Sequence, residues 1–332
     1  MSTVCWLGLG HMGLPMASHL RAGGFDVQGF DPSADATEAA RAAGIRPCSS
    51  PVEAAAGASV VFTMLPTHAH VHKALSTPGL LDATEEGALI VDCSTISGSD
   101  ARNLAELVST SGRQFLDAPV SGGTPGAQAG TLTFMVGGPT DAVDTLTPFL
   151  NTMGSRIFHV GEIGCGQSAK TVNNMMLAMN MASVCEAAAL GDRLGLNHET
   201  LVEIVKVSSG DSWVLRNFYP VAGIVDNAPA NKDFIPGFTA TLMRKDVGLA
   251  LTAGAEHPVD LGMTAEAARR LDRMIEAGLG DQDFSAMIRL ASGLLDHTLD
   301  GANIVTNPAS GSSISQDEPR KHPLHTSSSL SR

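Results

Sequence analysis

Short apolar runs alternate with Ala-rich amphipathic stretches through the first half of the chain. This order predicts βαβ units and a mostly parallel sheet with helices on both faces. The predicted strands are Val4–Leu7, Phe25–Phe30, Val60–Met64, Leu89–Asp92 and Gln114–Asp117, and the predicted helices are Met12–Ala22, Ala34–Ala43 and Ala101–Ser111. Two later strands, Thr131–Val136 and Ile157–Val160, flank a helix at Asp141–Leu150 and should extend the same sheet.

The pattern changes near Gly161. Gly161, Gly164 and Gly166 precede the segment Gln167–Leu194, which lacks Pro and has no Gly before Gly191. It predicts one long helix, which we expect to carry the boundary between two domains. Further helices are predicted at His198–Val207, Ala240–Ala255, Met263–Ala277 and Phe284–Leu295, so the second domain should be all-α.

A length of 332 residues agrees with two domains, because about 150 residues is usual for one. The predicted fold class is α/β, with a doubly wound, mostly parallel sheet followed by an all-α C-terminal domain. We place the first domain at residues 1–162 and the second, for substrate binding and oligomerisation, at residues 163–299. Residues 300–332 are Ser-rich, without aromatic residues or periodicity, and predict a disordered tail. A partner-binding role for this tail stays open.

The composition excludes several classes of protein. A formal net charge of −13 argues against a nucleic-acid or polybasic membrane-surface protein. No apolar run reaches the ~18 residues of a membrane span, and the N-terminus enters a strand without a leader pattern. Five scattered cysteines without a C-x-x-C pair argue against a disulfide framework or a structural zinc site. We therefore expect a reduced, cytoplasmic protein with no nucleic-acid or membrane partner.

A glycine pattern, Gly8-Leu9-Gly10-His11-Met12-Gly13, follows the first predicted strand and opens the first predicted helix. Glycines here let the backbone approach a pyrophosphate at a helix N-terminus, as in Rossmann-type folds. Asp31 ends the second strand about 20 residues further on, where an acid binds the ribose hydroxyls. Asp31 would repel a 2′-phosphate and no Arg is adjacent, so we expect NAD rather than NADP. A simple turn and a surface Asp are the alternative.

Oxidation of an alcohol also needs a base for the hydroxyl proton. Of the six lysines, Lys170 lies early in the long predicted helix, with Asn174 one turn later on the same face. Burial beside another cation would lower a lysine pKa from about 10.4 toward neutral pH. The alternative is an interfacial lysine that pairs with an acid.

Ser121, Gly122 and Gly123 follow the strand Gln114–Asp117, at the edge of the sheet where ligands bind in open α/β folds. A hydroxyl and successive backbone N–H groups at this edge can bind an anion. A tight connecting loop would use the same residues, so both interpretations stay open.

Four ordered segments resemble the β-hydroxyacid dehydrogenase family. They are Trp6–Ala17, Asp117–Gly123 with Gly130–Thr133, Gly164–Lys170 with Asn173 and Asn174, and Lys245–Ala250. Three more segments are similar to the branch of the family that acts on 3-hydroxyisobutyrate: Ser208–Trp213, Gly237–Phe238 and Asp283–Ser285. Together these segments span most of the chain outside the tail.

The resemblance implies roles for particular residues. Lys170 would be the catalytic acid/base, and Asn174 would help to hold the substrate. Substrate-binding residues would be Ser121, Gly122, Gly123, Trp213, Phe238 and Asp246. Cofactor-binding residues would be Gly8, Leu9, Gly10, His11, Met12, Gly13, Asp31, Met64, Leu65, Pro66, Thr95 and Lys245. No metal is expected, because the eleven histidines show no ligand spacing.

The implied reaction is NAD-dependent oxidation of 3-hydroxyisobutyrate to methylmalonate semialdehyde, a step of valine catabolism. Other small 3-hydroxy acids remain alternatives, namely 3-hydroxypropionate, glycerate, serine and tartronate semialdehyde. A non-catalytic dinucleotide-binding scaffold is a further alternative, because fold alone does not fix function. The resemblance also implies a homodimer or homotetramer.

Overall fold

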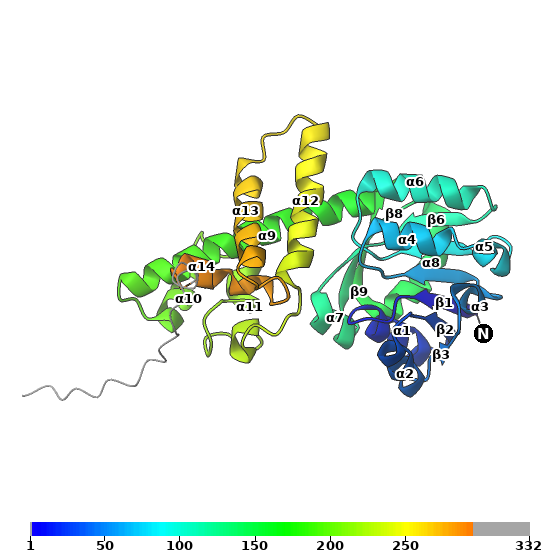
Figure 1. Ribbon diagram of the computed structural model, residues 1–332, viewed down its shortest axis with the longest axis horizontal. Helices are drawn as coiled ribbons and strands as arrows, with labels where there is room; N and C mark the ends of the chain where they lie inside the picture. Colours follow the sequence, from blue (N-terminus) through cyan, green and yellow to red (C-terminus); the bar gives the residue numbers. More distant parts are fainter. Residues whose placement is uncertain (1, 295–332) are drawn as a thin grey trace, which may run out of the picture.

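One twisted sheet organises the N-terminal half of the chain, and a helical half follows it, as Figure 1 shows. The computed structural model describes residues 2–294, so the predicted tail 300–332 lies outside the described residues. The strands are β1 (Thr3–Leu7), β2 (Asp26–Phe30), β3 (Arg46–Pro47), β4 (Val60–Thr63), β5 (Leu89–Asp92), β6 (Gln114–Asp117), β7 (Val120–Ser121), β8 (Leu132–Gly137) and β9 (Gly154–Gly161). Their order is β3-β2-β1-β4-β5-β6-β8-β7, with β9 beside β8.

Strands β1 to β6 are parallel, β8 is antiparallel to β6 and β7, and β9 is parallel to β8. The predicted mostly parallel sheet and its extension by two later strands are therefore confirmed. Every residue of β4 and β5 is buried, as expected for central parallel strands that are covered on both faces.

Alternate side chains of β1 enter two hydrophobic cores, one on each face of the sheet. Val4 and Trp6 belong to the first core, and Cys5 and Leu7 to the second. The helices of this half are α1 (Gly13–Ala22), α2 (Ala34–Ala42), α3 (Pro51–Ala55), α4 (His68–Leu75), α5 (Leu80–Ala83), α6 (Gly98–Ser109), α7 (Gly123–Ala129) and α8 (Thr140–Met153). Helices α1, α2 and α8 cover the first core, and α3 to α6 cover the second.

Some local details differ from the sequence prediction. Helix α6 begins at Gly98 rather than Ala101, because the Ser97 side chain accepts a hydrogen bond from the N–H of Asp100 at 2.9 Å. Gly123 is the first residue of α7, so the predicted anion-binding segment opens a short helix.

The second half is helical, and the predicted all-α character is confirmed. It contains α9 (Cys165–Arg193), α10 (His198–Lys206), α11 (Trp213–Asn217), the 3₁₀ helix η1 (Pro229–Lys232), α12 (Ala240–Glu256), α13 (Gly262–Glu276), the 3₁₀ helix η2 (Phe284–Met287) and α14 (Ile288–Ala291). Helix α9 runs from the sheet into the core of this half (Figure 1).

The single helix predicted at Phe284–Leu295 is wrong. The Asp283 carboxylate accepts the N–H and hydroxyl of Ser285, which favours the tight 3₁₀ turn η2. Helix α14 then ends at Ala291, and Gly293 has a φ of +75°, which terminates helical backbone.

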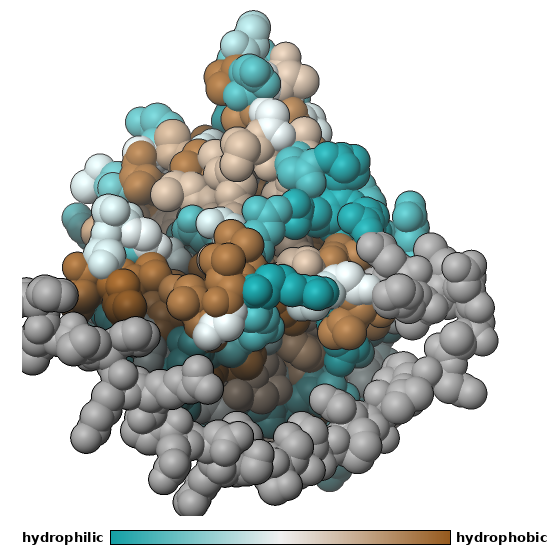
Figure 2. Space-filling view, turned by 90° about the vertical axis from the view of Figure 1, so that its left-hand side faces the viewer, coloured by the Kyte–Doolittle hydropathy of each residue, from teal (hydrophilic) through white to brown (hydrophobic). Residues whose placement is uncertain are grey.

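Exposed apolar side chains gather at the far end of the helical half, the end that faces the viewer in Figure 2. Those at the ends of α9 and α10 are Leu190, Leu194, Leu196, Ile204 and Val207. Contiguous apolar surface of this kind is typical of an interface.

The start of α9 is fastened to the sheet by a buried carboxylate. Asp117, the last residue of β6, accepts hydrogen bonds from the N–H groups of Gly164 at 2.7 Å and Gln167 at 2.8 Å. A Cβ on Gly137 or Gly166 would lie 2.5 Å and 2.8 Å from the two Asp117 oxygens, so both glycines leave room for the carboxylate. Burial raises the pKa of Asp117 to about 6.

Gln167 provides a second attachment of α9. Its side chain accepts from the N–H of Ile96 at 3.1 Å and donates to the carbonyl of Ser94 at 2.7 Å. The first turn of α9 is therefore held to the ends of both β5 and β6.

We predict that Asp117→Asn destabilises the protein by about 1–3 kcal/mol, because an amide cannot accept from both buried N–H groups. Denaturant unfolding followed by circular dichroism measures this loss. Asp144→Asn, an exposed position of α8, is the matched control and should change little. Equal stability of the two variants would contradict the assigned role of Asp117.

Candidate active site

The glycine loop between β1 and α1 contains two sterically constrained glycines and one that is free of constraint. A Cβ on Gly8 would lie 2.4 Å from the Met64 carbonyl oxygen, and one on Gly13 would lie 1.9 Å from the Gly8 carbonyl oxygen. A Cβ on Gly10 would meet no atom within 4 Å. The fold therefore requires glycine at positions 8 and 13, whereas Gly10 leaves open space that a pyrophosphate fits.

Two contacts fix this loop. The Trp6 indole N–H donates to the Gly8 carbonyl at 2.9 Å. Asp31, at the end of β2, accepts from the N–H of Leu9 at 2.8 Å and from the N–H of Ser33 at 2.9 Å. The structure thus brings Asp31 beside the glycine loop. Within this loop His11 is exposed and Met12 is half-buried.

The segments after β4 and β5 lie at the same edge of the sheet. Met64 contacts the glycine loop, and the N–H of Leu65 donates to the Ser94 hydroxyl at 2.9 Å. Lys245, from α12, donates to the carbonyl of Thr95 at 2.7 Å and to that of Pro66 at 3.2 Å. One lysine of the helical half therefore joins both of these segments.

Lys245, which is half-buried, also belongs to a cluster of polar side chains with Lys170, Asn174 and Asp246. The Asn174 amide donates to Asp246 Oδ2 at 2.5 Å. Lys245 Nζ lies 3.1 Å from Asp246 Oδ1 as an ion pair without hydrogen-bond geometry. Lys170 has only 9% of its surface exposed, and Asn174 and Asp246 are buried too.

The environment of Lys170 suits proton transfer. Burial lowers its pKa to about 8; the Asp246 charge opposes this shift and the Lys245 charge adds to it. A pKa of about 8 lets the amine exchange a proton near neutral pH, whereas an ordinary lysine stays protonated.

Ser121, Gly122 and Gly123 connect β7 to α7, with φ of +130° at Gly122 and +59° at Gly123. Both glycines are exposed, so their N–H groups are open to an anion. A Cβ on Gly237, from the helical half, would lie 3.7 Å from the Thr124 hydroxyl. A loop of the second half therefore approaches this segment.

Trp213 and Phe238 belong to a series of ring contacts within the helical half. Trp213 packs on Phe218 at 5.0 Å, Phe218 on Phe284 at 6.1 Å, and Phe284 on Phe238 at 6.0 Å, each measured between ring centroids. Trp213 is 54% exposed, so its ring is accessible to a ligand.

Sequence reasoning gave no role to several buried groups around the site, chiefly Asp92, Asp117 and Gln167. Asp92 accepts from the Thr63 hydroxyl at 2.6 Å and from the N–H of Ser94 at 3.1 Å, which shapes the segment after β5. Asp92 and Asp117 are each the last residue of a predicted strand, at the edge of the sheet where ligands bind. That position in the sequence could have marked both as residues of the site.

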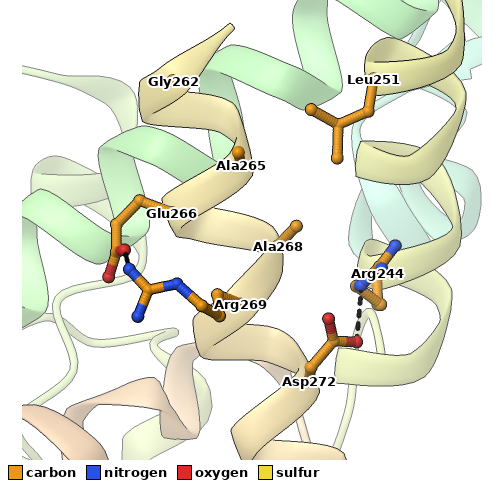
Figure 3. A pocket seen from close by; sticks show the side chains of 8 residues that line it. All are labelled: Arg244, Leu251, Gly262, Ala265, Glu266, Ala268, Arg269 and Asp272. Atoms are coloured by element: carbon orange, nitrogen blue, oxygen red, sulfur yellow. Dashed lines mark hydrogen bonds and ion pairs between the residues drawn. The ribbon is translucent and has the colours of Figure 1, made fainter.

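A hollow of about 370 Å³ lies between α12 and α13, outside this site (Figure 3). Its side chains pair with one another, as Arg244 does with Asp272 at 2.7 Å. Among residues 2–294, no helix is long and apolar enough to span a bilayer, and no group of three or more His, Cys, Asp or Glu could hold a metal ion.

Family models cover nearly all described residues. The NAD binding domain of 6-phosphogluconate dehydrogenase matches residues 3–161. The model described as the NAD-binding domain of NADP-dependent 3-hydroxyisobutyrate dehydrogenase matches residues 164–291. The fold is that of the NAD-dependent hydroxyacid dehydrogenases, and the NAD-binding models that match both halves of the chain support NAD as the cofactor.

The chain belongs to the β-hydroxyacid dehydrogenase family, as its relatives show. The NAD-dependent L-serine dehydrogenase of Pseudomonas aeruginosa is 42% identical, over 87% of this chain and 98% of that protein. The 3-hydroxyisobutyrate dehydrogenase of the same organism is 40% identical, over 88% and 99%. The solved structure of Mycobacterium tuberculosis 3-hydroxyisobutyrate dehydrogenase with L-serine has a TM-score of 0.81 and 41% identity, over 87% and 99%.

We predict that Gly10→Ala leaves the unfolding free energy of the ligand-free protein within about 0.5 kcal/mol of wild type, because its Cβ meets open space. Its affinity for NAD should fall at least tenfold, since the methyl group fills that space. Gly13→Ala should instead destabilise the fold itself. Thermal unfolding and calorimetric titration with NAD separate the two effects, and unchanged NAD affinity in Gly10→Ala would refute this assignment.

Proposed function

We propose that the protein oxidises 3-hydroxyisobutyrate to methylmalonate semialdehyde, with Lys170 as acid/base. The observation that carries the proposal is the buried Lys170 with its lowered pKa, on a helix whose start is fastened to the cofactor edge of the sheet. Family membership supports the reaction class.

When bound at the glycine loop, NAD would supply the acceptor for the hydride of the carbinol carbon. Neutral Lys170 Nζ takes the hydroxyl proton, so that the alcohol becomes an aldehyde; in the reverse direction the ammonium returns the proton to the developing alkoxide. General acid/base catalysis of this kind contributes about 10²–10⁴-fold. Asn174, oriented by Asp246, holds the substrate beside Lys170.

The remaining roles concern binding. The hydroxyl of Ser121 and the N–H groups of Gly122 and Gly123 bind the substrate carboxylate, and Trp213 and Phe238 shape the pocket. Gly8 to Gly13 hold the pyrophosphate, and Asp31 binds the ribose hydroxyls and repels a 2′-phosphate, which favours NAD over NADP. The cofactor is also lined by Met64, Leu65, Pro66 and Thr95, and Lys245 reaches it from the helical half.

L-serine is the second candidate substrate. The relative named as an L-serine dehydrogenase is as similar as the relative named as a 3-hydroxyisobutyrate dehydrogenase, and the solved structure contains L-serine. 3-Hydroxypropionate and glycerate, with tartronate semialdehyde as a substrate of the reverse reduction, complete the set of alternatives. A non-catalytic scaffold is disfavoured by the intact Lys170 cluster.

Domain organisation and setting complete the proposal. Residues 1–162 bind NAD, and residues 163–299 bind substrate and form a homodimer or homotetramer through exposed apolar side chains such as Leu190 and Leu194. We place the protein in the cytoplasm and its reaction in valine catabolism.

We expect NADH formation with one enantiomer of 3-hydroxyisobutyrate, at a kcat/KM above those for L-serine, glycerate and 3-hydroxypropionate, and with NAD preferred over NADP. Lys170→Ala should lose at least 100-fold in kcat. Initial rates at 340 nm measure both. Preference for another acid would reassign the substrate, and NAD binding without turnover of any acid would favour the scaffold.

The pH dependence should follow Lys170. Below pH 8 the amine is mostly protonated and cannot accept a proton, so kcat/KM for oxidation should fall tenfold per pH unit and level off above pH 8. Reduction should show the opposite dependence. Asp246→Asn should move the midpoint below 8, because Asp246 favours the charged lysine. A wild-type midpoint near 10 would contradict the buried-lysine mechanism, provided that circular dichroism shows a folded protein throughout.

A further inference from the structure

A loop of the helical half, residues 233–239, has strained backbone. Asp233 and Phe234 have φ of 47° and 58°, and they are the non-glycine residues with positive φ within the described chain. A bulky residue in this region costs free energy that neighbouring contacts must offset, and such strain is concentrated at functional sites. Arg289 supplies part of the offset, since it pairs with Asp233 at 2.9 Å and lies over the Phe234 ring at 5.1 Å.

Asp283 holds the other end of this loop. Its Oδ2 accepts from the N–H groups of Gly237 at 3.1 Å and Phe238 at 3.2 Å, and its Oδ1 accepts from the N–H and hydroxyl of Ser285. The N–H of Asp283 donates to Phe234 O at 2.9 Å. With no exposed surface, Asp283 fixes the loop from inside the domain.

The fixed loop approaches the proposed carboxylate-binding segment. Gly237 lies opposite Thr124, the residue after Gly123, with ordinary van der Waals space for one methyl group between them. Phe238 packs edge-on against Phe284, the residue after Asp283. The position of Gly237 and Phe238 relative to the other half of the site is therefore set by one carboxylate.

The candidate substrates differ at a single carbon. 3-Hydroxyisobutyrate has a methyl group on C2, serine an ammonium, glycerate a hydroxyl and 3-hydroxypropionate only hydrogen. In the proposed function, Ser121 to Gly123 hold the carboxylate and Lys170 holds the reacting hydroxyl. The C2 substituent must then be distinguished by the residues of the helical half that lie next to the Ser121–Gly123 segment.

We propose that Asp283 is a positioning residue for substrate specificity: through Gly237 and Phe238 it sets the space for the substituent on C2 of the 3-hydroxy acid. This inference rests on the proposed function. Asp283 itself touches neither substrate nor cofactor in this assignment, so its effect should appear in substrate selection rather than in proton transfer.

The test is the ratio of kcat/KM for the preferred C2-substituted acid over that for 3-hydroxypropionate. One methyl group in an apolar pocket supports at most a roughly 10–200-fold ratio. In Asp283→Asn the ratio should fall at least fivefold, through a higher KM for the C2-substituted acid, while the pH midpoint for Lys170 stays unchanged. Asp272→Asn, in the outer hollow of Figure 3, is the matched control and should keep the wild-type ratio.

A second variant keeps the test valid if Asp283→Asn folds poorly. Gly237→Ala adds one methyl 3.7 Å from the Thr124 hydroxyl without a clash, so the protein should fold as wild type. Its KM should rise for the C2-substituted acid and stay unchanged for 3-hydroxypropionate. Equal losses for both acids in both variants would overturn the inference and leave the proposed function standing. A wild-type protein that oxidises none of these acids would overturn both.

Discussion

The Asp117 carboxylate accepts the N–H groups of Gly164 and Gln167 at the start of α9, and the site depends on this contact. Helix α9 carries Lys170, and in the proposed function it must present this lysine to a cofactor that the sheet holds. Asp117 fixes the first turn of α9 to β6, and Gln167 fixes the same turn to the segment after β5. Lys170 follows Gln167 by one turn, so its position is determined by the sheet. The cost of burying the carboxylate, visible in its raised pKa, is offset by two charge-assisted hydrogen bonds.

The same placement explains why the Lys170 amine can exchange a proton near neutral pH. Burial favours the neutral amine, the Asp246 carboxylate favours the ammonium, and Lys245 opposes it. Lys245 in turn donates to the carbonyl groups of Thr95 and Pro66, which follow β5 and β4. The charges that set the pKa of Lys170 therefore come together only where the helical half meets this end of the sheet. The position of Lys245 at the sheet and the pKa of Lys170 are therefore coupled, and a shift of α12 would change both.

Local patterns predicted the parts of the molecule that depend on neighbouring residues. The alternation of strands and helices predicted the sheet. The spacing from Gly10 to Asp31 predicted that Asp31 belongs with the glycine loop, and Asp31 does contact Leu9 of that loop. The roles of Asp117 and Asp283 were not predictable, because their partners Gln167 and Gly237 lie 50 and 46 residues away in sequence. The error at Phe284–Leu295 has a local origin, since the Asp283 side chain accepts from Ser285 and favours a 3₁₀ turn over the predicted single helix.

Asp117 and Asp283 perform the same physical task on opposite sides of the site. Each is a buried carboxylate that accepts two backbone N–H groups of a segment distant in sequence and so fixes that segment. In the proposed function, the segment fixed by Asp117 carries the proton-transfer group that every 3-hydroxy acid needs. The segment fixed by Asp283 is the one that we propose faces the C2 substituent, which differs among these acids. Relatives of 42% and 40% identity named for different substrates agree with this separation, because selection can change in the helical half while the chemistry is kept.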